Sequence, residues 1–102
     1  MTLHPIFREV LYMPTLQEIK DYLGVDGGHS DPLLLSQLEA ARELVESILR
    51  YQIAKINPVP ATVKQAILFA CAYMFTGREQ ADIKVLEQML RNMLSSLRRE
   101  VF

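Results

Sequence analysis

The feature that most constrains the fold is a long apolar segment in the second half of the chain. Residues Ala66 to Phe75 form an unbroken run of ten apolar side chains, within a segment from Ala61 to Thr76 that is apolar nearly all round. The run is about half of the ~20 residues that a helix needs to cross a bilayer, so we expect no membrane-spanning segment. A helix that is apolar on nearly all sides is buried by its neighbours. The segment therefore predicts a central helix around which the rest of the chain packs.

Two further helices are predicted in the first half, where residues typical of helix ends stand at the right places. Thr15 and Glu18 have the spacing of a capping box, and Gly24 stands where a left-handed C-terminal cap is expected. Asp31 and Pro32 predict the start of a second helix, as its N-cap and its first helical residue. This second helix has the clearest amphipathic pattern in the chain, with apolar residues three or four apart: Leu34, Leu38, Ala41, Val45 and Ile48.

Prolines and caps also place the remaining elements. Pro58 and Pro60 interrupt any helix, so residues 52–60 are predicted to be a loop. Gly77 is expected to be the C-cap of the central helix, and Asp82 the N-cap of a fourth helix. The predicted apolar stripe of that fourth helix consists of Ile83, Leu86, Leu90, Met93 and Leu97.

These elements define the expected fold class. No segment combines the alternating pattern, the β-branched residues and the tight turn of a β-hairpin, and 102 residues are enough for one hydrophobic core but not for two. We therefore predict an all-α protein with a single small domain of about four helices around a buried, mostly apolar third helix. Its expected extent is residues 15–102, preceded by an N-terminal extension, residues 1–14, that is left unassigned.

Charge is nearly balanced overall but uneven along the chain. Eleven basic and twelve acidic side chains give a net charge of −1, which argues against non-specific binding to nucleic acid. Residues 1–31 hold two basic and five acidic side chains, whereas residues 61–102 hold six basic and four acidic ones. The two parts either meet between neighbouring subunits, pair within one fold, or remain solvated.

The residue types that usually carry chemistry are few. Cys71 is the only cysteine and lies in the apolar segment, where burial raises a thiol pKa and suppresses nucleophilicity. His4 and His29 are predicted in different loops, without a second ligand at metal-binding spacing. The carboxylates of the second helix, Glu39 and Glu43 among them, fall on its polar side and are interpreted as surface. The sequence therefore predicts no enzyme, no cofactor and no metal site.

Taken in order, these motifs resemble the head-tail connector (adaptor) family of tailed double-stranded DNA phages and prophages. In the first half of the chain, the resemblance is carried by residues Thr15 to Asp26 and Asp31 to Glu46. In the second half it is carried by the Pro58-Val59-Pro60 run, Val63 to Leu68 and Ala72 to Phe75. Leu86 to Leu97 takes the place of the family's C-terminal segment. It covers roughly residues 15–97. The segment from Arg50 to Pro60 departs from the family, because it is short and has no glycine.

The resemblance implies a structural virion protein, made in the cytoplasm of the bacterial host. Such proteins form a ring of about a dozen copies beneath the portal protein, bind a stopper or tail-completion protein, contact no membrane and let DNA pass without sequence-specific binding. A nearly neutral chain suits such a channel, because tight phosphate contacts would hinder DNA passage. The residues that the resemblance implies for the channel-facing loop are Gln52, Lys55 and Asn57. Those that it implies for the portal or subunit interface are Arg91, Arg98, Arg99 and Phe102.

Two other classes of protein are compatible with a small all-α chain. A helix-turn-helix regulator would expose Arg, Lys, Asn or Gln on its recognition helix, whereas the third helix here is almost wholly apolar. A generic helical protein-interaction module, unrelated to phage and dimeric through the apolar stripe of the fourth helix, is the main alternative. The solution mass, dimeric or ring-sized, distinguishes this module from a connector.

Overall fold

A computed structural model describes residues 13–49, 61–77 and 82–95. These residues form four helices, α2 (Leu16–Leu23), α3 (Asp31–Leu49), α4 (Ala61–Gly77) and α5 (Ile83–Met93), and no strand is present among them. The predicted all-α class is confirmed. The predicted loop at residues 52–60 and the first twelve residues of the predicted N-terminal extension lie outside the described residues.

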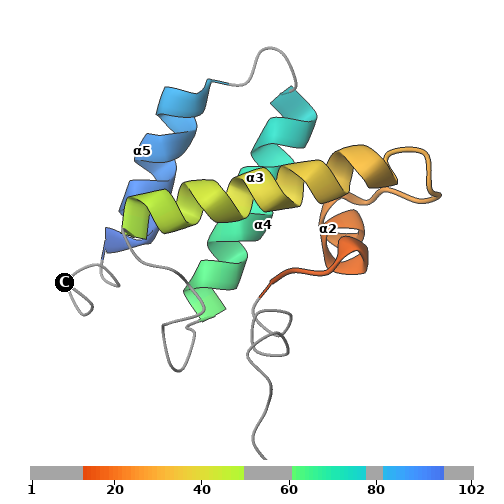
Figure 1. The fold of residues 1–102 in the computed structure, drawn as a ribbon, viewed down its shortest axis with the longest axis horizontal. Helices are drawn as coiled ribbons and strands as arrows, with labels where there is room; N and C mark the ends of the chain where they lie inside the picture. Colours follow the sequence, from red (N-terminus) through yellow and green to blue (C-terminus); the bar gives the residue numbers. More distant parts are fainter. Residues whose placement is uncertain (1–12, 50–60, 78–81, 96–102) are drawn as a thin grey trace, which may run out of the picture.

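The helices are arranged in a thin slab with α4 at its centre. In Figure 1, α3 crosses in front of α4 and α5, while α2 and α5 lie on opposite sides of α4. α4 contacts each of the other three described helices. The slab measures 37 × 35 × 17 Å, and its short dimension corresponds to two layers of helices, whose axes pack 8–10 Å apart. The prediction that the third predicted helix is the central one is confirmed.

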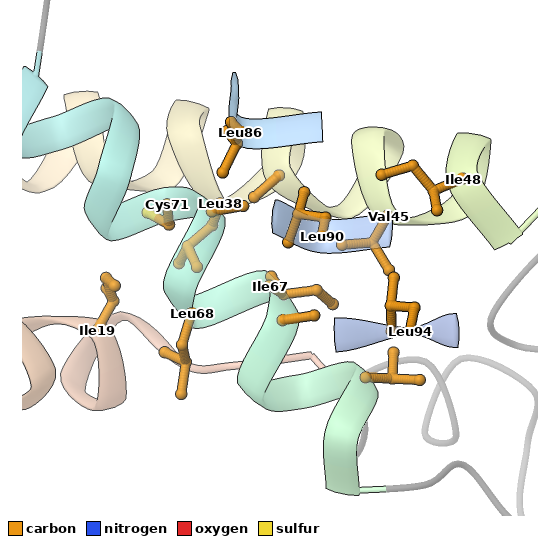
Figure 2. Close-up of a cluster of buried hydrophobic side chains, with 14 of the residues drawn as sticks. Ile19, Leu38, Val45, Ile48, Ile67, Leu68, Cys71, Leu86, Leu90 and Leu94 are labelled. Atoms are coloured by element: carbon orange, nitrogen blue, oxygen red, sulfur yellow. The ribbon is translucent and has the colours of Figure 1, made fainter. Parts of the chain in front are cut away.

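The core forms where the inner faces of the helices meet. The five residues predicted from the amphipathic pattern of α3 are all buried, and Ile19 of α2 is fully buried as well. α4 adds Val63, Ala66, Ile67, Leu68, Ala70 and Cys71. Figure 2 shows side chains of all four helices meeting in one cluster. Each large aliphatic side chain buried in this way contributes roughly 1.5–3 kcal/mol to folding, so most of the stability of these short helices comes from packing.

α4 is less completely covered than its composition predicts. Phe69, Tyr73, Met74 and Phe75 are only partly buried, although they pack against the core. The rings of Phe69 and Tyr73 lie side by side, with centroids 6.5 Å apart. The prediction of a helix buried on most sides holds for the sides that α2, α3 and α5 contact. The other side of α4 is less buried because the helices form two layers, and no described helix covers the side of α4 that is turned away from α3.

Local hydrogen bonds confirm several predicted helix ends. The Glu18 amide donates to the Thr15 hydroxyl at 3.1 Å, and the Thr15 amide donates to the Glu18 carboxylate at 3.0 Å, which completes the capping box of α2. Gly24 ends α2 with φ of 71°, in the left-handed region that glycine enters at little cost. The Asp82 carboxylate accepts from the amides of Lys84 and Val85 at 3.0 and 3.3 Å, and so caps α5.

Two predicted caps are displaced by one residue. The first intrahelical bond of α3 runs from the Leu34 amide to the Ser30 carbonyl at 2.9 Å, which makes Ser30 the N-cap in place of Asp31. Pro32 is then the second helical residue, a position that suits proline because first-turn amides have no intrahelical acceptor. Gly77 is the last residue of α4 rather than the residue beyond it.

The inner face of α5 also differs from the predicted stripe. Leu86, Leu90 and Leu94 are fully buried, four residues apart, whereas Ile83 is 45% exposed. Met93 is partly buried against the core, and Leu97 lies outside the described residues. The stripe was predicted from apolar residues three or four apart. The rotation of α5 against α3 and α4 buries only residues that are four apart, because these face the other two helices.

Candidate assembly surfaces

Cys71, the most reactive residue type in the chain, is part of the core. Its side chain is fully buried in α4, and its Sγ lies 4.0 Å from the Leu34 carbonyl oxygen of α3. Burial raises the pKa of this thiol to about 11, because the thiolate cannot be solvated. The predicted burial of this cysteine is confirmed, and its low reactivity stays a prediction.

The histidines do not form a metal centre with described residues. His29 is exposed in the turn between α2 and α3, and the described ranges contain no group of three or more His, Cys, Asp or Glu side chains arranged to hold a metal ion. His4 lies outside these ranges. The sequence-based view that the protein binds no metal therefore stays a prediction.

The carboxylates on the polar side of α3 surround one guanidinium. Arg42 forms ion pairs with Glu39 and Glu46, and it lies 4.0 Å from Glu43, whose side chain is 69% exposed. The hydrogen bond from Arg42 holds the pKa of Glu39 below its ordinary value, because it stabilises the charged carboxylate. The predicted surface location of Glu39 and Glu43 is confirmed, and the group is an ion network along one helix.

Two ion pairs connect α2 with the other helices. Lys64 of α4 lies 2.6 Å from Glu18 of α2, and Lys20 lies 3.1 Å from Asp31 at the start of α3. The Lys64 hydrogen bond, followed by that of the Thr15 amide, lowers the pKa of Glu18. Part of the acidic charge of residues 1–31 is therefore neutralised within the same molecule, by a basic residue of the segment 61–102.

Other charges of these two parts remain exposed. Asp21 and Asp26 lie at the end of α2 and in the turn after it, and Lys84 and Arg91 lie on α5. All four side chains are exposed, and none forms an ion pair with another described residue. Asp21 accepts a hydrogen bond only from Gln17, at 2.8 Å. α5 also carries Asp82 and Glu87, which form no ion pair with another described residue, so the charges on this helix are mixed.

The exposed large apolar side chains gather at two sides of the slab. Three lie on α2 and the first turn of α3, and two lie in the first turn of α5: Tyr22 (50% exposed), Leu33 (43%), Leu35 (54%), Ile83 (45%) and Val85 (46%). Sequence reasoning missed this distribution. The exposure of Leu33 and Leu35 could have been predicted from the sequence. Successive side chains of a helix point in different directions, so when Leu34 faces the core its two neighbours point away from it.

The residues predicted for channel and portal contacts are only partly described. Arg91 is exposed in the last turn of α5, as an interface residue requires. The other six predicted residues lie outside the described ranges, and their roles stay predictions: Gln52, Lys55, Asn57, Arg98, Arg99 and Phe102. None of the helices in the described ranges is long and apolar enough to cross a membrane.

These observations define a class of protein before they define a family. The described residues form a small all-α domain with an apolar core, a buried cysteine and exposed apolar side chains on α2, α3 and α5. Residues 13–99 match the family model described as Phage gp6-like head-tail connector protein, and the chain belongs to this family. Searches of curated proteins and of solved structures gave no match.

Family membership confirms the resemblance found in the sequence and supplies the general role. The match covers nearly the same residues as the resemblance, 13–99 against 15–97. The protein is a structural phage protein, a component of the virion that connects head and tail and interacts with other head and tail proteins.

Proposed function

We propose that this chain is the adaptor subunit of a homo-oligomeric ring beneath the portal, through which DNA passes and to which a stopper or tail-completion protein binds. The observation that carries the proposal is the family match over residues 13–99, which includes every described helix. A head-tail connector must surround the path of the DNA, and repeated copies with a head-to-tail contact close into a ring around an axis.

The charge of the chain supports passage of DNA rather than capture of DNA. The net charge is −1, and Lys64, one of the basic residues, is already paired with Glu18. Acidic side chains outnumber basic ones by twelve to eleven, so the salt-dependent attraction that fixes a protein on DNA is weak. In this proposal the loop with Gln52, Lys55 and Asn57 faces the channel.

The C-terminal part of the chain is proposed to contact the portal or the neighbouring subunit. Arg91 is exposed on α5, and Arg98, Arg99 and Phe102 continue the same segment in the sequence. The first fourteen residues are proposed to be an extension outside the connector domain of residues 15–102.

The alternative, a dimer formed through the apolar stripe of α5, is disfavoured by the core. Leu86 and Leu90, two members of the predicted stripe, are fully buried within the chain itself. A dimer of that kind would need the same side chains to face a partner.

The test is the solution mass by light scattering, with the protein alone and mixed with the portal ring from the same genome, at two protein concentrations. A ring-sized species, formed alone or only on the portal, is the expected result. A fixed dimer that ignores the portal would contradict the proposal.

A further inference from the structure

We propose that residues 1–12 of this chain bind back onto its own outer face, the apolar side of the slab that is turned away from α3. The outer face consists of Phe69, Ala72, Tyr73, Met89 and Met93. The occupant belongs to the same molecule, so the contact forms in a single chain and does not depend on the proposed ring. It gives α4 the cover that its apolar composition predicts.

The first observation is an aromatic patch on the uncovered side of α4. Gln65 and Thr76 are exposed, and they mark the side of the helix that points away from α3. Phe69 and Ala72 lie between them at spacings of four, three and four, and therefore point to the same side. The ring of Tyr73 lies next to that of Phe69, with centroids 6.5 Å apart. Polar residues thus border an apolar surface that is only partly buried by the described helices.

α5 extends this patch with two methionines. Met89 and Met93 are four residues apart, along a line beside the three buried leucines of α5. α5 runs antiparallel to α4, and α3 crosses in front of both (Figure 1). In a right-handed helix with this direction, the line of Met89 turns towards α4 on the side away from α3. Methionine adapts its shape to a neighbour, which makes it common on binding surfaces.

The second observation is the sequence pattern of the segment that precedes α2. Its apolar residues stand at i, i+3, i+4, i+7 and i+8, the spacing of one side of a helix: Leu3, Ile6, Phe7, Val10 and Leu11. Its two charged residues, Arg8 and Glu9, fall away from that side. Isolated helices shorter than about 12–15 residues are only marginally stable in water. An apolar side of this length therefore needs a surface on which to pack.

The third observation is the point at which the segment joins the slab. Met13 packs against the core and Pro14 is buried, so the chain is already held on the slab before α2 begins. Twelve residues span about 18 Å as a helix and up to about 40 Å when extended. The slab is 17 Å thick, and both α2 and the outer face adjoin α4. The segment is therefore long enough to reach the outer face in either form.

Tethering favours this segment over a second copy of the chain as the occupant. A segment joined to the slab at Met13 is held near the outer face at an effective concentration in the millimolar range. A second copy reaches that concentration only in a very concentrated solution. A two-fold dimer through the same face would also bring the exposed Gln65 and Thr76 of one copy close to those of the other. The outer face is therefore assigned to the chain's own first residues.

The test uses tryptophan fluorescence, because the chain contains no tryptophan. Phe69→Trp places a reporter in the outer face, at a concentration where light scattering shows single chains. In this background Ile6→Ser/Val10→Ser makes the apolar side of the segment polar. We expect this pair to shift the tryptophan emission to longer wavelength and to increase its quenching by acrylamide. Arg8→Ser/Glu9→Ser is the matched control, which leaves the net charge unchanged and should alter neither signal.

Urea unfolding without the reporter provides a second, independent measurement. Ile6→Ala/Val10→Ala should lower the urea midpoint by roughly 1 M, because two aliphatic side chains lose their contacts. Its effect should combine non-additively with that of Phe69→Ala, since both changes remove the same contact. Leu35→Ala is the control, because Leu35 is 54% exposed on α3, in the other layer of the slab. The effects of Leu35→Ala and the segment variant should simply add.

Three outcomes would overturn the proposal. The first is a reporter whose emission does not respond to Ile6→Ser/Val10→Ser, and the second is additivity between Phe69→Ala and the segment variant. The third is a response that appears only at concentrations where light scattering shows more than one chain, which would assign the outer face to a second copy. The proposed ring is tested separately, by the mass with the portal, so that failure of one proposal leaves the other standing.

Discussion

Truncation of Leu90 tests whether α5 belongs to the core of one chain or to a contact between chains. Leu90 is fully buried with Leu86 and Leu94, and these side chains attach α5 to α3 and α4 (Figure 2). A Leu→Ala change at a buried site costs roughly 2–5 kcal/mol, as lost transfer free energy plus the cavity that remains. A domain of this size is stable by about 5–15 kcal/mol, so Leu90→Ala should remove a large fraction of the total.

The matched control is Val85→Ala on the same helix. Val85 is 46% exposed, and substitution at an exposed site usually changes stability by less than about 0.5 kcal/mol. Both variants are unfolded in urea at a concentration where light scattering shows single chains. With a urea dependence of about 1–3 kcal/mol/M, a loss of about 3 kcal/mol lowers the midpoint by roughly 1–3 M for Leu90→Ala. Equal losses in the two variants, or a loss for Leu90→Ala that disappears on dilution, would refute the assignment of Leu90 to the core of a single chain.

Three further predictions concern local contacts. Glu18 has a lowered pKa in the folded chain, so its contribution to the free energy of unfolding is complete above the ordinary value of 4.5 and is lost as pH falls through the lower folded value. Glu18→Gln should cost up to about 1 kcal/mol at pH 7 and weaken the pH dependence of urea unfolding below pH 5. If the loss of stability at low pH is the same in this variant as in the wild type, the Lys64 pair is contradicted. Gly24→Ala should cost roughly 1 kcal/mol of stability, because φ is 71°, a backbone conformation that alanine rarely adopts. No atom lies within 4 Å of the added Cβ, so no steric clash contributes to this cost. Gly28→Ala is the control in a thermal melt, and equal melting temperatures of the two variants would refute the backbone strain. Cys71 should react with an aromatic disulfide reagent only when the chain unfolds, because its thiol is buried and its pKa is about 11; labelling of the native protein as fast as in urea would disprove its burial.

Local features of this fold could be predicted because their causes are local. The capping box of Thr15 and Glu18 involves residues three apart, and the left-handed cap at Gly24 depends on one residue's freedom in φ. The amphipathic pattern of α3 identified its buried side, since a helix with a single apolar stripe has only one way to face a core.

The inner face of α5 could not be predicted in the same way. Met93 and Leu94 are neighbours about 100° apart around the helix, and both continue an apolar stripe from Leu90 at a spacing of three or four. Only the rotation of α5 against α3 and α4 decides that Leu94 is fully buried and Met93 partly exposed. The same limit applies to α4, because its composition predicts burial but not how many neighbours supply it.

From the uneven charge along the sequence alone, pairing within one chain and pairing between chains were both possible. The fold shows which charged residues pair within the chain. Glu18 meets Lys64 because α2 packs against α4. Asp26 and Lys84 remain apart because α4 stands between α2 and α5 (Figure 1). Which charges are left over depends on the packing order of the helices, and this order is a long-range property that spacing in the sequence does not encode.

A subunit with this design can fold before it assembles. The core is closed within one chain, since the large side chains of α3, α4 and α5 that face it are fully or almost fully buried without a partner. The stability of the domain therefore comes from contacts inside one chain and does not need a second copy. In the proposed ring, each subunit would fold first and bind its neighbours afterwards.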